Sequence, residues 1–131
     1  MNAVNNNVVS AQGLRKSYRG KPALDGTHFQ IEAGKIIGLI GPNGAGKTTA
    51  LKAILGLIPF EGDLKVLGLD PRKQRDELMR EVCFIADVAV LPRWIKVKEA
   101  IDFVDGIHPR FDRAKCERFI ANTKLNPNLR V

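Results

Sequence analysis

The sequence has few cysteines, few aromatic residues and no long apolar run. Its two cysteines, Cys83 and Cys116, match neither zinc-ligand spacing nor a disulfide framework. No stretch approaches the roughly 18 apolar residues of a membrane span, and the N-terminus lacks the basic and apolar regions of a secretory leader. We therefore expect a soluble, cytoplasmic protein in a reducing compartment, with any membrane link made through a partner.

The net charge of +7 is spread along the chain. Residues 1–70 hold eight Lys and Arg against five Asp and Glu, and the remainder holds thirteen against nine. Aromatic residues make up only 6% and do not interleave with the basic residues as a base-stacking surface would require. The charge therefore indicates an ordinary solvated surface, and nucleic acid is not an expected partner.

The pattern of apolar residues and turn signals predicts an α/β fold of one globular unit, or part of one. The run IIGLI within residues 35–40 is apolar on both faces, which predicts a central strand buried on both sides. Residues 82–86 predict a second buried strand. The other expected elements are strands at residues 8–16, 27–32 and 64–67, and helices at residues 47–57, 73–81, 97–106 and 112–124.

A glycine-rich motif lies between the expected central strand and the first helix. The sequence GPNGAGKT, from Gly41 to Thr48, fits the pattern G-x-x-x-x-G-K-[ST] of a phosphate-binding P-loop. Its glycines permit the positive φ angles that turn successive amides inward, and the following helix adds the positive end of its dipole. Lys47 is then placed to meet the β- and γ-phosphates of a nucleotide, and the Thr48 hydroxyl to ligate Mg²⁺.

The segments around this loop resemble the start of an ATP-binding cassette (ABC) ATPase. They include LRKSY ending at Tyr18, ALDG at residues 23–26 and IEAG at residues 31–34, and they continue to about Glu99. The resemblance implies a P-loop NTPase core with an N-terminal antiparallel β subdomain and the start of a helical subdomain. We expect the core at about residues 8–92 and the helical part at about 93–131.

The same resemblance implies roles for individual residues. The aromatic ring of Tyr18 would stack on adenine, Thr49 would touch the α-phosphate, and the loop amides would face the phosphates of ATP. The family places a glutamine after the strand at residues 82–86, and Asp87 stands there in this sequence and would ligate Mg²⁺ together with Thr48. The expected nucleotide-binding residues are Tyr18, Gly41, Pro42, Asn43, Gly44, Ala45, Gly46, Lys47, Thr48 and Thr49.

Several parts of an ABC ATPase have no counterpart in the 131 residues. A second aspartate ending an apolar strand, the catalytic glutamate beside it, a signature loop like LSGGQ and a switch histidine are missing. We therefore expect a truncated, N-terminal portion of an ABC ATPase that binds ATP without turning it over. In the full-length parent, the resemblance implies a dimer of nucleotide-binding domains and a transmembrane permease partner.

Two other functions are compatible with the P-loop. A compact P-loop kinase or GTPase would use Asp87 as its magnesium aspartate, but this hypothesis leaves Tyr18 and the long N-terminal segment unexplained. A non-enzymatic regulatory or nucleic-acid-associated ATP-binding module rests on the positive charge alone.

Overall fold

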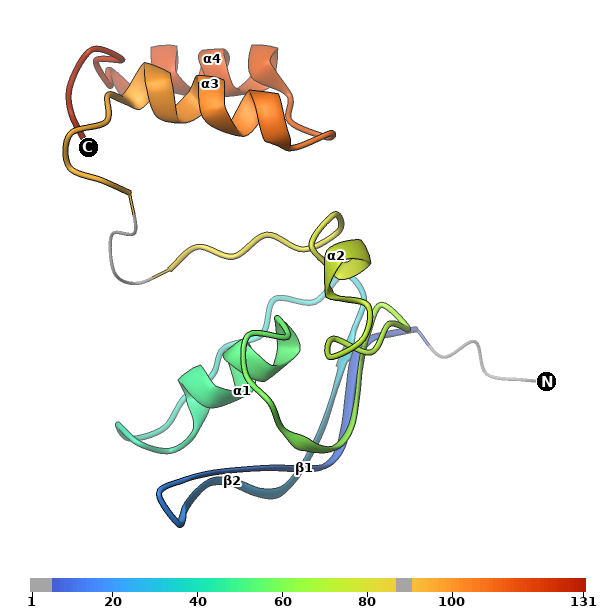
Figure 1. The fold of residues 1–131 in the computed structure, drawn as a ribbon. Helices are drawn as coiled ribbons and strands as arrows, with labels where there is room; N and C mark the ends of the chain where they lie inside the picture. Colours follow the sequence, from blue (N-terminus) through green and yellow to red (C-terminus); the bar gives the residue numbers. More distant parts are fainter. Residues whose placement is uncertain (1–5, 87–90) are drawn as a thin grey trace. The chain divides into compact units, whose positions relative to one another are not determined.

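A computed structural model describes residues 6–86 and 91–131 of the chain (Figure 1). The chain divides into two compact units, Met1–Val82 and Cys83–Val131. The first unit contains β1 (Asn7–Tyr18), β2 (Lys21–Glu32), α1 (Lys47–Ile54), β3 (Glu61–Val66) and α2 (Arg75–Leu78). The second contains α3 (Val97–Ile107) and α4 (Arg113–Thr123).

The N-terminal strands form a three-stranded antiparallel sheet in the order β2-β1-β3. A two-residue turn joins β1 to β2, and both of its residues, Arg19 and Gly20, have positive φ angles of 48° and 78°. Such turns match the right-handed twist of the flanking strands, so the hairpin stays paired up to Tyr18 and Lys21. The antiparallel N-terminal sheet predicted from the sequence is therefore confirmed.

A bulge in β1 redirects its apolar side chains. Val9 and Ala11 alternate toward the core, but the next buried residue is Leu14 rather than Gly13. Gly13 has φ 60°, and the register shifts there against both neighbouring strands. The extra residue lets β1 bend while it keeps its apolar side chains on one face.

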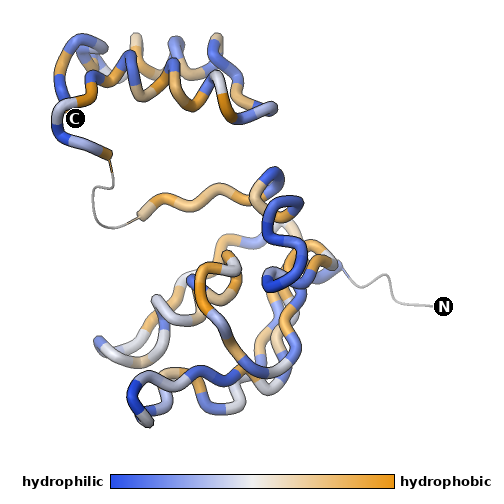
Figure 2. The backbone as a smooth tube through the Cα atoms, viewed as in Figure 1, coloured by the Kyte–Doolittle hydropathy of each residue, from blue (hydrophilic) through white to orange (hydrophobic). Residues whose placement is uncertain are grey.

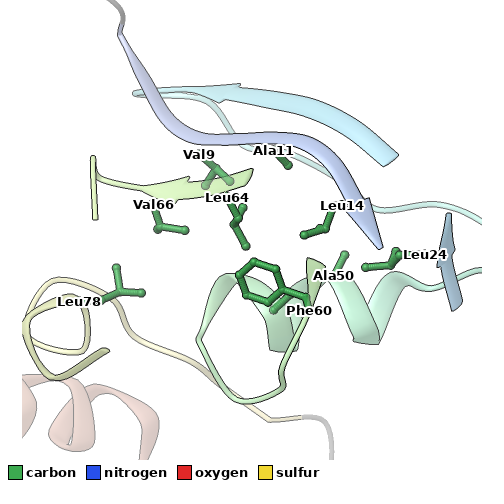
Figure 3. Packing of buried hydrophobic residues seen from close by; sticks show 10 residues of the cluster. Val9, Ala11, Leu14, Leu24, Ala50, Phe60, Leu64, Val66 and Leu78 are labelled. Atoms are coloured by element: carbon green, nitrogen blue, oxygen red, sulfur yellow. The ribbon is translucent and has the colours of Figure 1, made fainter. Parts of the chain in front are cut away.

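The core of the first unit lies between this sheet and α1. This core contains Leu14 from β1, Leu64 from β3, Ala50 from α1 and Phe60, which directly precedes β3 (Figure 3). Leu14, Leu64 and Leu78 are completely buried. Burial of such side chains is the main favourable term in folding, so this cluster holds α1 against the hairpin.

The two strands expected at residues 35–40 and 82–86 are not formed, and both expectations were wrong. Ile40 and Ile85 are 98% and 90% exposed, although Figure 2 shows residues 83–86 as a hydrophobic stretch. Within the described residues, neither segment pairs with a strand. A strand needs a neighbour for its backbone N–H and C=O groups, and apolar sequence alone does not supply one.

Smaller differences concern element lengths. The helix expected at residues 73–81 is only one turn, α2, and α1 ends at Ile54 rather than at residue 57. β2 starts at Lys21, well before the expected residue 27, because the tight turn extends the hairpin.

A polar cluster fixes the chain between β3 and α2. The Arg72 side chain donates two hydrogen bonds, of 3.1 and 2.9 Å, to the buried carboxylate of Asp70. The Arg72 backbone N–H donates another to the same carboxylate at 2.9 Å. The guanidinium also lies 4.6 Å from the centre of the Phe60 ring. The hydrogen bonds from Arg72 lower the pKa of Asp70 to about 2, against the opposing effect of burial.

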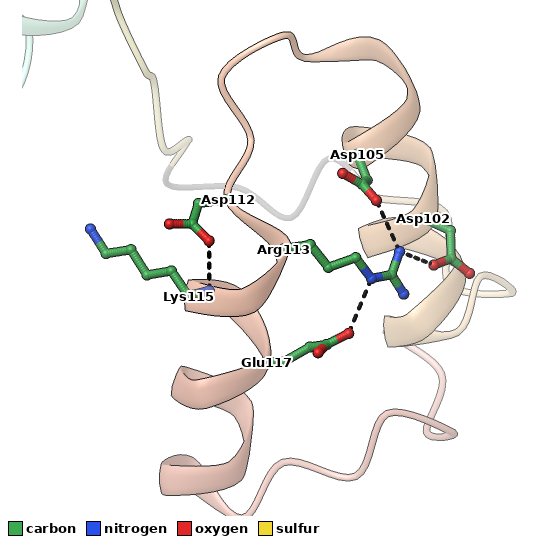
Figure 4. A network of polar contacts seen from close by, with 6 residues as sticks. All are labelled: Asp102, Asp105, Asp112, Arg113, Lys115 and Glu117. Atoms are coloured by element: carbon green, nitrogen blue, oxygen red, sulfur yellow. Dashed lines mark hydrogen bonds and ion pairs between the residues drawn. The ribbon is translucent and has the colours of Figure 1, made fainter.

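In the second unit, Arg113 at the start of α4 ties the two helices together (Figure 4). Its guanidinium contacts Asp102 at 2.6 Å and Asp105 at 3.2 Å on α3, and Glu117 at 3.1 Å on its own helix. Hydrogen bonds to these carboxylates raise the pKa of Arg113 above its usual value, and the bond to Asp102 has the largest effect. Asp112 caps α4 by accepting a 2.8 Å hydrogen bond from the Lys115 N–H.

Neither of these helices, nor any other among the described residues, has the length and hydropathy needed to cross a membrane.

Because the folded pKa of Asp70 lies below its unfolded value of about 3.8, its ionisation stabilises the fold above that pH. This contribution is lost as the pH falls from about 4 to about 2. We expect Asp70→Asn to lower the free energy of unfolding at pH 7 by about 1–3 kcal/mol. Urea denaturation between pH 7 and pH 2 should show the gap between the two proteins closing below pH 4. A gap that stays constant would contradict the role of this carboxylate.

Candidate functional site

The glycine loop turns back on itself before it enters α1. Gly44 and Gly46 have φ angles of 87° and 89°, which side chains disfavour. The Ala45 N–H donates to the Pro42 carbonyl at 3.2 Å, and the Ala50 N–H donates to the Gly46 carbonyl at 2.8 Å. The loop is therefore a tight turn that leads directly into the first helical hydrogen bond.

Gly46 packs the loop against β2 of the hairpin. A Cβ atom at this position would lie 2.3 Å from the Ala23 carbonyl oxygen and 3.0 Å from Leu24 Cδ2 on β2. Only glycine fits so close to a neighbouring backbone, and Gly46 is buried. The start of α1 is thereby held against the strand that follows the Tyr18 turn.

The first turn of α1 offers unoccupied backbone donors. The N-cap is Gly46, so no side chain caps the helix, and the first turn contains no acidic residue. The first N–H groups of a helix have no intrahelical acceptor, and the helix dipole makes this end positive. The end of α1 at Lys47, Thr48 and Thr49 is therefore suited to an anion such as a phosphate.

The side chain of Lys47 folds back across the loop. Its Nζ donates to the carbonyl oxygens of Gly41 at 2.6 Å and Pro42 at 2.8 Å. These contacts place the ammonium group beside the loop amides. Lys47 is also the first residue of α1, so its charge adds to the positive end of the helix.

Tyr18 and the loop line one depression of about 290 Å³. Tyr18 is 46% exposed, so part of its ring is available for contact. The structure thus brings together most of the residues predicted from the sequence, although Gly41, Pro42 and Ala45 do not line the depression. Its lining residues are Tyr18, Ala23, Asn43, Gly44, Gly46, Lys47, Thr48 and Thr49.

The predicted metal ligands are described only in part. Thr48 is exposed at the start of α1, on the rim of this depression. Asp87 lies outside the described residues. Among the residues that are described, no group of three or more His, Cys, Asp or Glu side chains forms a metal cluster.

Sequence reasoning missed two residues at this site. Ala23 supplies the carbonyl against which Gly46 packs, and it also lines the depression. The Nζ of Lys16 lies 5.3 Å from the centre of the Tyr18 ring. Neither contact could be predicted from the sequence, because the first depends on how the loop packs on β2 and the register of β1 shifts between Lys16 and Ser17.

Comparisons with known proteins identify the family. The family model described as ABC transporter matches residues 24–130. The chain belongs to the ABC transporter family. The ABC ATPase resemblance seen in the sequence is thereby confirmed, and a compact kinase or GTPase is not favoured.

Three similar proteins illustrate this relationship. The probable multidrug ABC transporter ATP-binding protein YbhF of Escherichia coli is 32% identical over 112 residues, which are 85% of this chain and 19% of YbhF. The manganese transport system ATP-binding protein MntB of Bacillus subtilis is 44% identical over 71 residues, which are 53% of this chain and 28% of MntB. A solved ATP-binding subunit of an ABC transporter has a TM-score of 0.79 at 22% identity, over 94% of this chain and 54% of that subunit.

These comparisons confirm the fold class, an ABC ATPase fold with an antiparallel N-terminal sheet. The chain spans 19% to 54% of the lengths of these three proteins.

The close approach of Gly46 to β2 can be tested by adding one methyl group. Gly46→Ala should lower the free energy of unfolding by more than the roughly 1–2 kcal/mol that a positive φ alone costs an alanine. Gly34→Ala is the matched control, because Gly34 has φ 73° but no atom near its Cβ position. Urea denaturation of both variants measures the difference. Equal losses would show that the contact with Ala23 is not a constraint.

Proposed function

We propose that this chain binds ATP with Mg²⁺ and forms the adenine- and phosphate-binding part of a longer ABC transporter ATPase. The depression that joins Tyr18 to Lys47 and the start of α1 carries this proposal. It combines an aromatic face, an ammonium group and free helix amides, which suit the base, the charge and the oxygens of a nucleoside triphosphate.

We assign the individual contacts as follows. The loop amides from Asn43 to Gly46 face the phosphate oxygens, with the Ala45 N–H giving up its hydrogen bond to the Pro42 carbonyl. Lys47 neutralises the β- and γ-phosphates by exchanging its two carbonyl acceptors for phosphate oxygens. Thr49 contacts the α-phosphate. The remaining loop residues, Gly41 and Pro42, support the turn from outside the depression.

Thr48 would hold Mg²⁺ through its hydroxyl, and Asp87 would be a second oxygen ligand. A hydroxyl on the rim of an anion site fits the hard, oxygen-seeking character of this ion. When bound, Mg²⁺ would offset negative charge on the phosphates. The chain itself supplies the hydroxyl and holds it at the first turn of the helix.

We further propose that this chain alone does not hydrolyse ATP. Hydrolysis needs a group that positions or deprotonates the attacking water. Among the described residues that line the depression, none carries a carboxylate or an imidazole. The chain would therefore form a half-site whose catalytic groups come from other parts of a complete ATPase.

The proposed parent acts at the cytoplasmic side of a membrane, bound to a transmembrane permease, with two nucleotide-binding domains as a dimer. The names of the relatives describe ATP-binding proteins of multidrug and manganese transport systems, which supports this assembly. Because those two cargoes differ, we assign no transported substrate. Within the chain we propose a core at about residues 8–92 and the start of the helical subdomain at about 93–131.

Replacing the loop lysine tests the phosphate site. Lys47→Ala should abolish detectable binding of both Mg·ATP and tripolyphosphate in isothermal titration calorimetry, because the charge at the loop is lost. Lys52→Ala, in the last turn of the same helix, is the control for net charge and should bind as the unchanged protein does. Unchanged affinity of Lys47→Ala would refute the assignment.

Phosphate release from ATP by the unchanged chain should equal the rate in buffer alone, and turnover above that rate would overturn the half-site proposal.

Replacing the aromatic ring tests the base site separately. Tyr18→Ala should weaken ATP binding by about 1–2 kcal/mol and leave tripolyphosphate binding unchanged, because only the base stacks on the ring. Tyr18→Phe keeps the π-face and should retain the affinity for ATP. If the alanine variant bound both ligands as before, Tyr18 would have no role in base binding.

A further inference from the structure

Lys16 is a charged residue that contacts the proposed base-stacking ring without being part of the proposed phosphate site. Its Nζ lies 5.3 Å from the centre of the Tyr18 ring, within the range of a cation–π contact. Lys16 and Tyr18 both lie at the end of β1, where the register against β2 shifts between Lys16 and Ser17. Lys16 is half-buried, whereas Tyr18 is exposed.

The aromatic contact is the interaction that the structure gives to this ammonium group. Within the described residues, Lys16 forms no ion pair, whereas its neighbour Arg15 lies 3.9 Å from Asp25. The attraction between the ammonium group and the ring favours this arrangement of the two side chains.

The two side chains line different depressions. Tyr18 lines the depression that contains the glycine loop, and Lys16 does not. Lys16 instead lines a separate depression of about 470 Å³ together with Ser17, Pro22 and Phe60. The ammonium group thus contacts the ring from outside the depression in which the nucleotide would lie.

From this geometry we infer that Lys16 is a positioning residue for base recognition. It covers one face of the Tyr18 ring and leaves the other face, toward the glycine loop, for a purine. This inference rests on the proposed function, because it assumes that Tyr18 contacts the base. The ammonium group is attracted to the ring and so fixes its orientation before the base arrives. It also excludes the base from the covered face, since two groups cannot occupy that space.

Calorimetry with ATP and with tripolyphosphate separates this role from a general effect of charge. Lys16→Met keeps an unbranched side chain but removes the cation, and it should weaken ATP binding about two- to fivefold without changing the affinity for tripolyphosphate. Lys16→Arg should retain the affinity for ATP, because a guanidinium also binds an aromatic face. Lys35→Met is the control for the loss of one exposed positive charge and should change neither affinity.

A double substitution shows whether Lys16 acts through Tyr18. In the Tyr18→Ala background, Lys16→Met should cause no further loss of ATP affinity. A further loss equal to that of the single variant would overturn the inference, because Lys16 would then act independently of the ring. Equal weakening of ATP and tripolyphosphate by Lys16→Met would also overturn it and would leave the proposed function intact. A failure of the unchanged chain to bind either ligand would instead overturn the proposed function, and the inference with it.

The ring contact can also be measured without any nucleotide or any change to Lys16. In NMR spectra of the unchanged chain, the ε-methylene protons of Lys16 should be shifted upfield by the ring of Tyr18, the only tyrosine in the chain. The shift should vanish in Tyr18→Ala. Random-coil values in the unchanged, folded chain would overturn the inference whatever the behaviour of the Lys16 variants.

Discussion

The candidate site depends on one close contact between two pieces of backbone. Gly46 lies against the carbonyl of Ala23, with no room for a side chain between the loop and β2. This contact fixes the first turn of α1 beside the hairpin, and the tight turn at Arg19 and Gly20 brings Tyr18 to the same place. The aromatic ring and the positive end of α1 thus lie side by side, because glycine permits the close contact with β2 and the tight turn keeps the hairpin paired up to Tyr18.

The core of the first unit and a buried charged pair hold the segments on which that contact depends. The bulge at Gly13 keeps Leu14 on the core face of β1, where it meets Leu64 and α1 (Figure 3). The Asp70–Arg72 pair, with Phe60 beneath the guanidinium, fixes the chain that follows β3. The pair favours one arrangement of the backbone, because leaving the buried carboxylate of Asp70 without its partner is costly.

The chain exposes apolar side chains next to the glycine loop. Residues 35–40 lead directly into the glycine loop, yet their isoleucines face solvent and no strand pairs with them among the described residues. Unpaired backbone and exposed apolar side chains favour association with further strands. In the proposed parent, such strands would pair with residues 35–40 and so restrict the motion of the glycine loop that follows.

The amino-acid sequence by itself determined the glycine-rich loop, the helix that follows it and the family. These features are local: eight consecutive residues carry the motif, and the glycines set its backbone wherever the loop is placed. The helical spacing in residues 97–106 and 112–124 likewise predicted α3 and α4 closely, because helical hydrogen bonds join near neighbours. Only the tertiary structure decided which apolar runs became strands, since strand pairing joins residues distant in sequence, and residues 35–40 have no partner among those described. It also decided that Tyr18 lies beside the loop and that Lys16 lies over the Tyr18 ring, because both depend on how the hairpin packs and turns.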